Sequence, residues 1–277
     1  MSIVNLFHAV VYGVVQGITE FLPVSSTAHL TLIPKFFGWA YGGMGFDVAL
    51  HLGTALAVIV FFWKRWIELF KAGFTAPKSA NGKLFWIIVV STIPASLVGV
   101  LLDDKIAPLQ NNALVIGIML IVMGIILWIV DRAAQKDFNK LTDVNAKRGI
   151  VVGIAQCLAI IPGVSRAGIT ITAARAMKIG RETAAEFTFL LSTPIILGDA
   201  LYHLLKMHSD ATAAAEIAAV GGTGAMIVGI IVAAIVGMVS IKFLLDFLKK
   251  RSLFVFSAYR FVLGALVIIL AIAGVIR

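Results

Sequence analysis

The sequence predicts an all-α polytopic membrane protein with six transmembrane helices and two re-entrant helical segments. Of its 277 residues, 60% are hydrophobic and only 13% are charged, whereas soluble domains are roughly half apolar. Apolar runs of about 20 residues recur along the chain, which is the length that a helix needs to cross ~30 Å of hydrocarbon. Two further apolar segments are interrupted by proline and by polar residues, and this sets them apart from ordinary spans.

Six apolar runs are long enough to cross a bilayer, and linkers containing turn-forming residues separate them. They cover residues 46–63, 84–102, 113–131, 186–204, 219–245 and 253–275. The charged linker 131–148 divides the chain almost in half. We therefore expect a single integral membrane domain over residues 1–277, built of two repeats at approximately 1–135 and 145–277.

The two interrupted segments, 3–34 and 149–178, are expected to enter the membrane and return on the same side. Pro23 breaks the first and Pro162 the second, and each proline removes a backbone donor from its helix. Broken backbone at membrane depth persists only where protein or a water-filled cavity satisfies the freed groups. Polar side chains at that depth usually face a partner, a substrate or a cavity. The two breaks are therefore the candidate functional segments.

The two halves of the chain match weakly at an offset of 140 residues. The same residue types recur in the pairs Gly13 and Gly153, Gln16 and Gln156, Val24 and Val164, and Ser25 and Ser165. Three full spans in each half, an odd number, would make the second repeat inverted relative to the first. Inverted repeats with interrupted helices that meet near the midplane are a known way to build a membrane site for an ion or substrate.

Basic residues are distributed unevenly about the predicted spans. The formal net charge is +9. In the six-span arrangement 19 of the 23 Lys and Arg fall on one side of the membrane, and the other four are Lys35, Lys105, Lys206 and Arg277. The positive-inside rule makes the basic side cytoplasmic and places both termini outside, periplasmic or extracytoplasmic. The charge thus reports orientation and does not indicate a nucleic-acid partner. Membrane lipids are the expected neighbours, and a homodimer is compatible with the pattern.

The second break carries residues suited to binding a phosphate. Gly163 permits close backbone approach, Ser165 and Thr170 offer hydroxyls, and Arg166 supplies planar donors. Backbone N–H groups at the start of the following helix would add to an anion site. The competing interpretation is a glycine-rich helix contact with Arg166 extending to the membrane interface. The position of Arg166 shortly after a Pro-Gly break favours the phosphate cradle.

The first break places an acid, hydroxyls and a histidine in otherwise apolar sequence: Gln16, Glu20, Ser25, Ser26 and His29. Ser26 and His29 share a helix face if the chain after Pro23 is helical. A hydroxyl nucleophile needs an adjacent base, and histidine titrates near neutrality. His8, His51 and His208 are isolated in the sequence, which gives them no role.

At these two motifs the sequence resembles the bacitracin-resistance type undecaprenyl-diphosphate phosphatases. The resemblance rests on Gln16–Glu20, Phe21–His29 and Pro162–Thr170, in order and spacing along essentially the whole chain. It implies an enzyme of the bacterial inner membrane whose site opens to the outer side. Its reaction would convert undecaprenyl diphosphate to undecaprenyl phosphate and inorganic phosphate, recycling the lipid carrier for peptidoglycan and other cell-wall polymers and conferring bacitracin resistance. Ala167 departs from the family, which usually carries a second serine there.

Two mechanisms remain open at this point. In the first, Ser26 attacks the terminal phosphorus, His29 assists proton transfer, and Glu20 orients His29 or holds a metal. In the second, His29 or Glu20 activates water while Ser25 and Ser26 bind phosphate. In both, Arg166 clamps the anion. A divalent cation, Mg²⁺ or Ca²⁺, is expected to be held by Glu20 and Gln16 and to bridge phosphate oxygens. Gln16 is not an acid, so a scheme with two carboxylates around the metal is weakened.

Two other classes of protein share some of these features. A transporter or flippase of a phosphorylated polyprenyl lipid would also use inverted repeats and broken helices, but binding alone does not require the acid, hydroxyl and histidine of the first break. A second class of membrane phosphatase carries a Ser-Arg-x5-His-x3-Asp element. That class is excluded because Thr172 occupies the position of its histidine.

Overall fold

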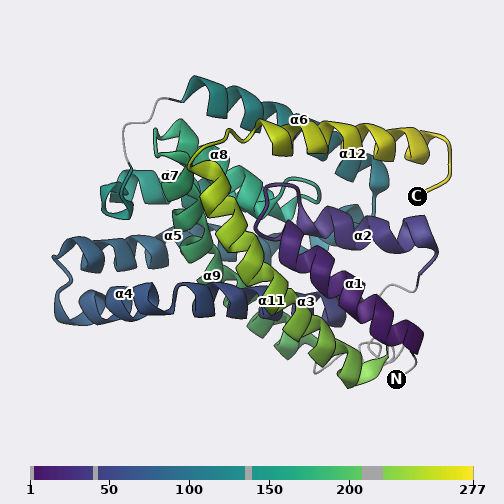
Figure 1. The fold of residues 1–277 in the computed structure, drawn as a ribbon, viewed down its shortest axis with the longest axis horizontal. Helices are drawn as coiled ribbons and strands as arrows, with labels where there is room; N and C mark the ends of the chain where they lie inside the picture. The colour runs from purple at the N-terminus through teal and green to yellow at the C-terminus, as the bar shows by residue number, and fades with distance from the viewer. Residues whose placement is uncertain (1–2, 40–42, 135–138, 208–220, 277) are drawn as a thin grey trace.

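The computed structural model describes residues 3–39, 43–134, 139–207 and 221–276, and the secondary-structure elements in those residues are all helices (Figure 1). Six of these helices are long and apolar enough to cross a membrane: α3 (Gly43–Phe61), α5 (Ala80–Gln110), α6 (Ala113–Ala133), α9 (Arg181–Met207), α11 (Gly222–Leu248) and α12 (Phe254–Ile272). The predicted all-α fold with six spans is confirmed. The start predicted for the fifth span, residue 219, lies outside the described residues.

The remaining helices are shorter. They are α1 (Ile3–Thr19), α2 (Ser26–Phe37), α4 (Trp63–Thr75), α7 (Ala146–Gln156) and α8 (Arg166–Ala176), with two short 3₁₀ helices, η1 (Leu141–Asp143) and η2 (Cys157–Ile160). Both interrupted segments are therefore broken helices, α1 with α2 and α7 with α8. Whether each returns to its side of entry stays a prediction.

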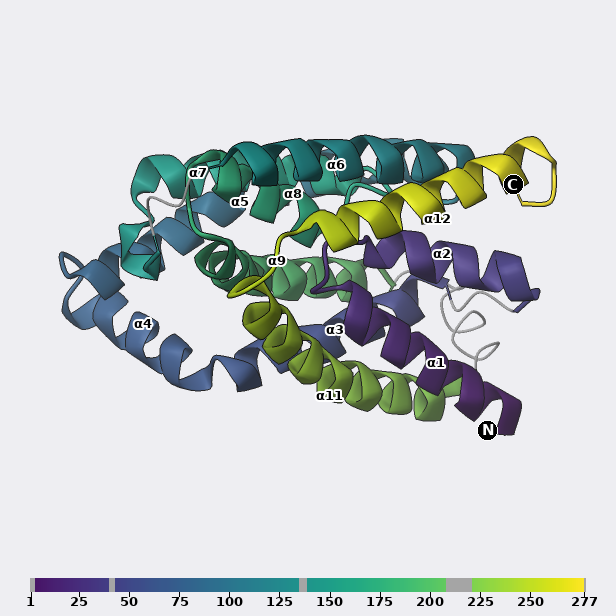
Figure 2. The same cartoon turned by 45° about the horizontal axis from the view of Figure 1, so that its top comes forward.

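Helix α4 was not predicted from the sequence, because its apolar residues lie among charged ones and form no continuous apolar run. Phe70 and Phe74 of α4 contact Phe85 of α5, with ring centroids 5.5 and 5.6 Å apart. The indole N–H of Trp86 on α5 donates to the backbone carbonyl of Gly73. These contacts join α4 and α5 as a hairpin that projects toward the left in Figures 1 and 2, and α5 extends beyond its predicted end at residue 102.

The spanning helices expose apolar stripes. Helix α11 exposes Ile227, Ile231, Ile235 and Val239, which are spaced four residues apart and therefore lie on one face. In water such a stripe would be unfavourable, but in a bilayer it contacts acyl chains. The stripe is thus a lipid-facing surface.

The two halves of the chain interlock. Helix α5 of the first half packs against α7 and α9 of the second, and α11 of the second half packs against α1 and α3 of the first. Figures 1 and 2 both show α6 lying beside α12 and α1 beside α11. This exchange is what two intertwined repeats would produce, although the inversion itself remains a prediction.

Small residues allow the closest of these helix contacts. A Cβ added at Gly153 of α7 would lie 2.1 Å from the Ser91 carbonyl oxygen on α5, and one added at Gly13 of α1 would lie 2.8 Å from Val232 Cβ on α11. Membrane helices commonly approach through such residues, since the apolar lipid gives them little other reason to associate.

We expect Gly153→Ala to destabilise the protein by about 1–3 kcal/mol, because the new methyl group would overlap backbone that cannot move aside. Gly99→Ala is the matched control, since a Cβ there has nothing within 4 Å. Thermal unfolding in detergent should show a lower midpoint for Gly153→Ala alone. Equal midpoints for the two variants would contradict the tight α5–α7 contact.

Candidate functional site

Both helix breaks end in a serine with an unusual backbone conformation. Ser25 has φ 76° and Ser165 has φ 74°, a region that residues other than glycine rarely adopt. Each serine caps the helix that follows, because its Oγ accepts a hydrogen bond from the backbone N–H three residues on, that of Ala28 or Gly168. Strained backbone of this kind tends to occur at functional sites. The two breaks thus present the N-termini of α2 and α8 in matching ways.

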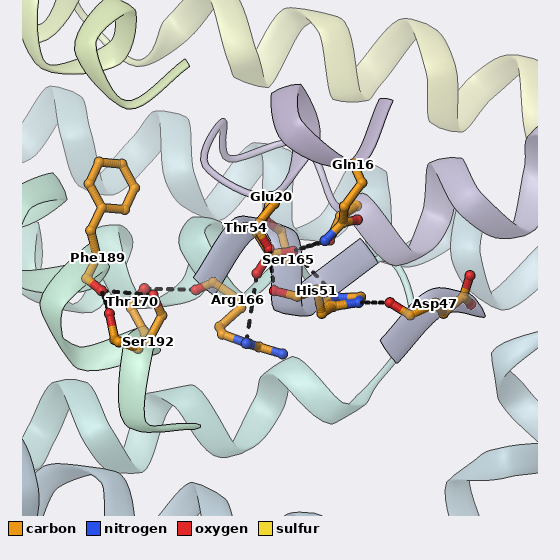
Figure 3. A network of polar contacts seen from close by, with 12 residues as sticks. Gln16, Glu20, Asp47, His51, Thr54, Ser165, Arg166, Thr170, Phe189 and Ser192 are labelled. Atoms are coloured by element: carbon orange, nitrogen blue, oxygen red, sulfur yellow. Dashed lines mark hydrogen bonds and ion pairs between the residues drawn. The ribbon is translucent and has the colours of Figure 1, made fainter. Parts of the chain in front are cut away.

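Glu20 is the centre of the polar cluster between these N-termini (Figure 3). Its Oε2 accepts hydrogen bonds from Ser26 Oγ at 2.7 Å and Gln16 Nε2 at 3.1 Å. His51 Nε2 lies 3.5 Å from the same oxygen, and Arg166 Nη1 lies 3.7 Å from Glu20 Oε1. Arg166 Nη1 is buried with no hydrogen-bond partner in the described part of the protein. This leaves a guanidinium donor available to an incoming anion.

The surroundings of Glu20 favour its ionised form. Arg166 lies beside its carboxylate, and Ser26 and Gln16 donate hydrogen bonds to it, and each of these groups stabilises the negative charge. An ionised carboxylate only accepts hydrogen bonds. The Ser26 hydroxyl therefore donates to Glu20, which leaves the oxygen lone pairs of Ser26 free to act.

A small cavity of about 30 Å³ lies between the two breaks, lined by Glu20, Ser25, Ser26, Thr27, His51, Ala159, Ile161, Ser165 and Arg166. A larger cavity of about 300 Å³ shares Thr27, His51, Ala159 and Arg166 with it. The shared residues make the two cavities neighbours. A ligand in the larger cavity could therefore place one end against Ser26 and Arg166.

The structure brings together five of the residues predicted from the sequence: Glu20, Ser25, Ser26, Ser165 and Arg166. Thr170 lies apart from them, since its Oγ1 donates to the Arg166 carbonyl within α8. Gly163 contributes backbone, with φ +89° and no room for a Cβ, which would lie 2.6 Å from the Ile116 carbonyl oxygen. Ala167 packs in the apolar core. The serine missing at 167 is therefore not a gap in the cavity wall.

His29 also lies away from the cavity lining. Its Nδ1 is 2.7 Å from the Ser25 carbonyl oxygen and its Nε2 is 2.6 Å from the Tyr259 hydroxyl. The two ring nitrogens are thus occupied by groups other than Ser26. In this arrangement Glu20, and not His29, is the acceptor in contact with the Ser26 hydroxyl.

Comparison with known proteins identifies the family. The sequence model described as Bacitracin resistance protein BacA matches residues 9–266. The chain belongs to the BacA family. Three similar relatives are named undecaprenyl-diphosphatase. That of Moorella thermoacetica is 46% identical, covering 95% of this chain and 97% of the relative. Those of Pelotomaculum thermopropionicum and Desulforudis audaxviator are 44% and 43% identical, each covering 97% of this chain and 98% of the relative.

His51 is a residue of this BacA-family site that the sequence reasoning missed. It lies in the apolar run of α3, far from either motif, and only its presence inside a span pointed to a function. Its Nδ1 lies 2.8 Å from the Asp47 carbonyl oxygen. A carbonyl only accepts, so Nδ1 carries a hydrogen, and Nε2, the nitrogen that faces Glu20, can donate to the carboxylate only from the doubly protonated ring.

We expect His51→Leu to lower kcat at least about 10-fold, since a hydrogen-bonding group beside a charged partner contributes about 1.5–3 kcal/mol. His51→Gln can still donate to Glu20 and should stay within about 3-fold of the original enzyme. His8→Leu is the control, because His8 stacks on Trp39 and does not line either cavity. Steady-state kinetics distinguish these cases, and full activity in His51→Leu would mean that its contact with Glu20 has no catalytic consequence.

The residues of the first break fit a divalent cation only in part. Among the described residues, no group of three or more His, Cys, Asp or Glu side chains is placed to hold a metal ion. Glu20 offers one carboxylate, and the neighbouring Gln16 has a buried Oε1 without a hydrogen-bond partner. Mg²⁺ is often bound by one or two carboxylates together with substrate phosphates. The donor set suits a cation that arrives with a diphosphate, and not a closed protein cage.

Proposed function

We propose that this chain hydrolyses undecaprenyl diphosphate to undecaprenyl phosphate and inorganic phosphate. The observation that carries the proposal is the Ser26 Oγ to Glu20 Oε2 hydrogen bond of 2.7 Å in the same small cavity as Arg166, whose Nη1 has no hydrogen-bond partner in the described residues. A hydroxyl held by a carboxylate beside a guanidinium with an unused donor is suited to attack on a phosphate. The similar relatives bear the name undecaprenyl-diphosphatase, and the proposed substrate is taken from that name.

The proposed first step is attack of Ser26 Oγ on the terminal phosphorus. The serine proton passes to Glu20 as the new P–O bond forms, and the bond to the bridging oxygen breaks so that undecaprenyl phosphate departs. Arg166 Nη1 and the backbone N–H groups at the start of α8 stabilise the charge on the transferred group. Water then attacks the phosphorus of the phosphoserine, the Oγ–P bond breaks, and the proton held by Glu20 returns to Ser26 Oγ as inorganic phosphate leaves. Phosphoryl transfer depends mainly on positioning and charge stabilisation, which this cavity supplies.

Attack by water is the alternative for the first step. Glu20 would then deprotonate water while Ser25 and Ser26 bind phosphate oxygens. The 2.7 Å contact between Ser26 and Glu20 favours the serine pathway, because a water molecule would have to displace that hydrogen bond. His29 assists in neither scheme unless its bonds to Ser25 and Tyr259 are exchanged. Its catalytic role stays a prediction.

A divalent cation belongs to the same proposal. Mg²⁺ or Ca²⁺ held by Glu20 and Gln16 would neutralise part of the diphosphate charge when bound. Glu20 would still orient Ser26 through its Oε2 hydrogen bond.

The isoprenoid chain of the substrate would extend from the larger cavity toward the surrounding lipid, because an apolar tail can reach both the cavity and the lipid.

The proposed location is the bacterial inner membrane, with both termini outside and the site open to that side. The described ends of the chain lie toward the same end of the molecule, on the right in Figures 1 and 2, and the α4–α5 turn lies at the opposite end. Basic residues are frequent in α4, in the turn after it and at the start of α5, namely Lys64, Arg65, Lys71, Lys78 and Lys83. The positive-inside rule assigns such an end to the cytoplasm.

The function is tested by incubating the purified chain with undecaprenyl diphosphate in detergent and measuring released phosphate. We expect release that is abolished in Glu20→Ala and Arg166→Ala. Intact substrate after incubation with the unaltered chain would defeat the enzyme assignment. Movement of a labelled polyprenyl phosphate across vesicles without hydrolysis would instead support the flippase alternative.

A further inference from the structure

Arg260 of α12 is a buried arginine that the proposed chemistry does not use. Its side chain is fully buried, at 0% exposure, and a buried charge is costly unless other groups compensate it. The five hydrogen bonds that it makes in the described part of the chain all end on backbone carbonyl oxygens. Its partners are thus carbonyl dipoles and not carboxylates.

These carbonyls belong to both helix breaks. Arg260 Nη1 donates to the Pro23 carbonyl at 3.1 Å, in the first break. Nη2 donates to the Gly163 carbonyl at 2.8 Å and the Val164 carbonyl at 3.1 Å, in the second. Nε donates to the Leu120 carbonyl of α6 at 3.1 Å. A single guanidinium therefore connects two segments about 140 residues apart in the sequence and fixes both to α6.

The bonded carbonyls immediately precede the residues of the site. Val164 comes directly before the strained Ser165, and Pro23 lies two residues before the strained Ser25. Ser26 and Arg166 are the first residues of the helices that these serines cap. The orientation of the two carbonyl groups therefore sets where the nucleophile and the anion clamp point.

We propose that Arg260 is a positioning residue, which holds the two breaks at the distance and angle that place Ser26 opposite Arg166. It lines neither cavity, and it acts through the backbone of both motifs. The planar guanidinium suits this role because its donors spread in a fixed fork. A lysine ammonium, as a compact point charge, cannot span carbonyls from both breaks in the same way.

Gly168 supports the same role. A Cβ added at Gly168 would lie 3.0 Å from Arg260 Nη1, so a larger residue would press on the guanidinium. The absence of a side chain at 168 leaves space for Arg260 against the first turn of α8. The space needed by Arg260 therefore explains why residue 168 of the second motif is a glycine, which phosphate binding alone does not explain.

The protein contains a second buried arginine that serves as a control. Arg175, at the other end of α8, is 1% exposed. It donates to Asp131 Oδ1 at 3.0 Å and to the carbonyl oxygens of Ile179 and Ala134. Its loss should disturb the fold to a similar degree. It lies about 13 Å along the helix from Arg166, by the rise per residue of an α-helix, and outside both cavities.

The test compares Arg260→Met, Arg260→Lys and Arg175→Met for kcat, KM and thermal midpoint in the purified, monodisperse protein. We expect Arg260→Met to lower kcat about 100-fold with KM changed less than about 5-fold, since a misplacement of ~1 Å in reacting groups can cost that much. Arg175→Met should keep kcat within about 3-fold after correction for the folded fraction, because mutations distant from the reacting groups act mainly through stability.

Arg260→Lys keeps the positive charge but removes the forked donors, so it tests whether the geometry of the guanidinium matters. It also provides a test if Arg260→Met does not fold. We expect at least a 10-fold loss of kcat in Arg260→Lys, because a single ammonium cannot hold both breaks. Near-normal kcat in Arg260→Lys would overturn the proposal, as would equal loss of kcat in Arg260→Met and Arg175→Met at equal stability.

The inference rests on the proposed site, and the two can fail separately. If Arg166→Ala were fully active, the site assignment would fail whatever Arg260 does. If Arg166→Ala were inactive and both Arg260 variants had normal kcat, the site would stand and the positioning role would be lost.

Discussion

Ser26→Ala is expected to lower kcat by about 10³-fold or more, the range seen when the nucleophile of a coupled catalytic unit is removed. The reason is that no other hydroxyl donates to Glu20 in the described structure, where Ser26 Oγ lies 2.7 Å from Oε2. Glu20→Gln should cause a comparable loss, since the amide has no negative charge to accept the serine proton. Phosphate release under single-turnover conditions measures both.

Ser240→Ala is the matched control for Ser26→Ala. Ser240 is a buried serine of α11 whose hydroxyl donates to the Val236 carbonyl of its own helix, so its removal leaves the site intact. A substrate labelled in the terminal phosphate should leave label on Ser26 when the reaction is quenched early. Near-normal turnover by Ser26→Ala, with no labelled enzyme, would mean that the nucleophile of the first step is water activated by Glu20.

Arg166→Lys is expected to reduce kcat/KM by about 10²–10³-fold, because removal of one preorganised donor at the transferring group costs about that much. Lysine keeps the charge, but it replaces planar donors with a point charge. We expect most of the loss in kcat, since the charge that Nη1 stabilises develops during transfer, with a smaller rise in KM.

The control for this prediction is Arg251→Ala, an exposed basic residue between α11 and α12, which should retain full activity. Kinetics with a series of substrate concentrations separate kcat from KM. An Arg166→Lys enzyme with unchanged kcat would show that Arg166 binds the ground state only, or that another donor acts on the transferred phosphate.

Much of the fold could be predicted because it depends on local composition. A span such as 113–131 is recognisable from its own hydropathy, and α6 (Ala113–Ala133) follows it closely. Helix α4 could not be recognised in this way. Its stability comes from Phe70 and Phe74 packing on a neighbouring helix, and that packing partner is not visible in the local pattern.

The candidate site also had a part that local sequence predicted and a part that depends on tertiary contacts. The motifs identified Glu20, Ser26 and Arg166, since polar groups beside a proline break are unusual in apolar sequence. The sequence also made His29 a candidate base, because it lies three residues after Ser26. In the structure the ring of His29 is bonded to Ser25 and Tyr259, since helical spacing brings Cα atoms together but does not fix where side chains end.

The sequence by itself determined the membrane class, the six spans, the two breaks and the residues that make a phosphate site chemically reasonable, because these depend on composition and short-range spacing. Only the tertiary structure decided that Glu20 meets Ser26, that His51 of α3 faces the same carboxylate, and that Arg260 holds both breaks. Glu20 and Ser26 meet because the chain turns at the Pro23 break, and the other contacts join residues tens to hundreds of positions apart through helix packing, which no local pattern specifies.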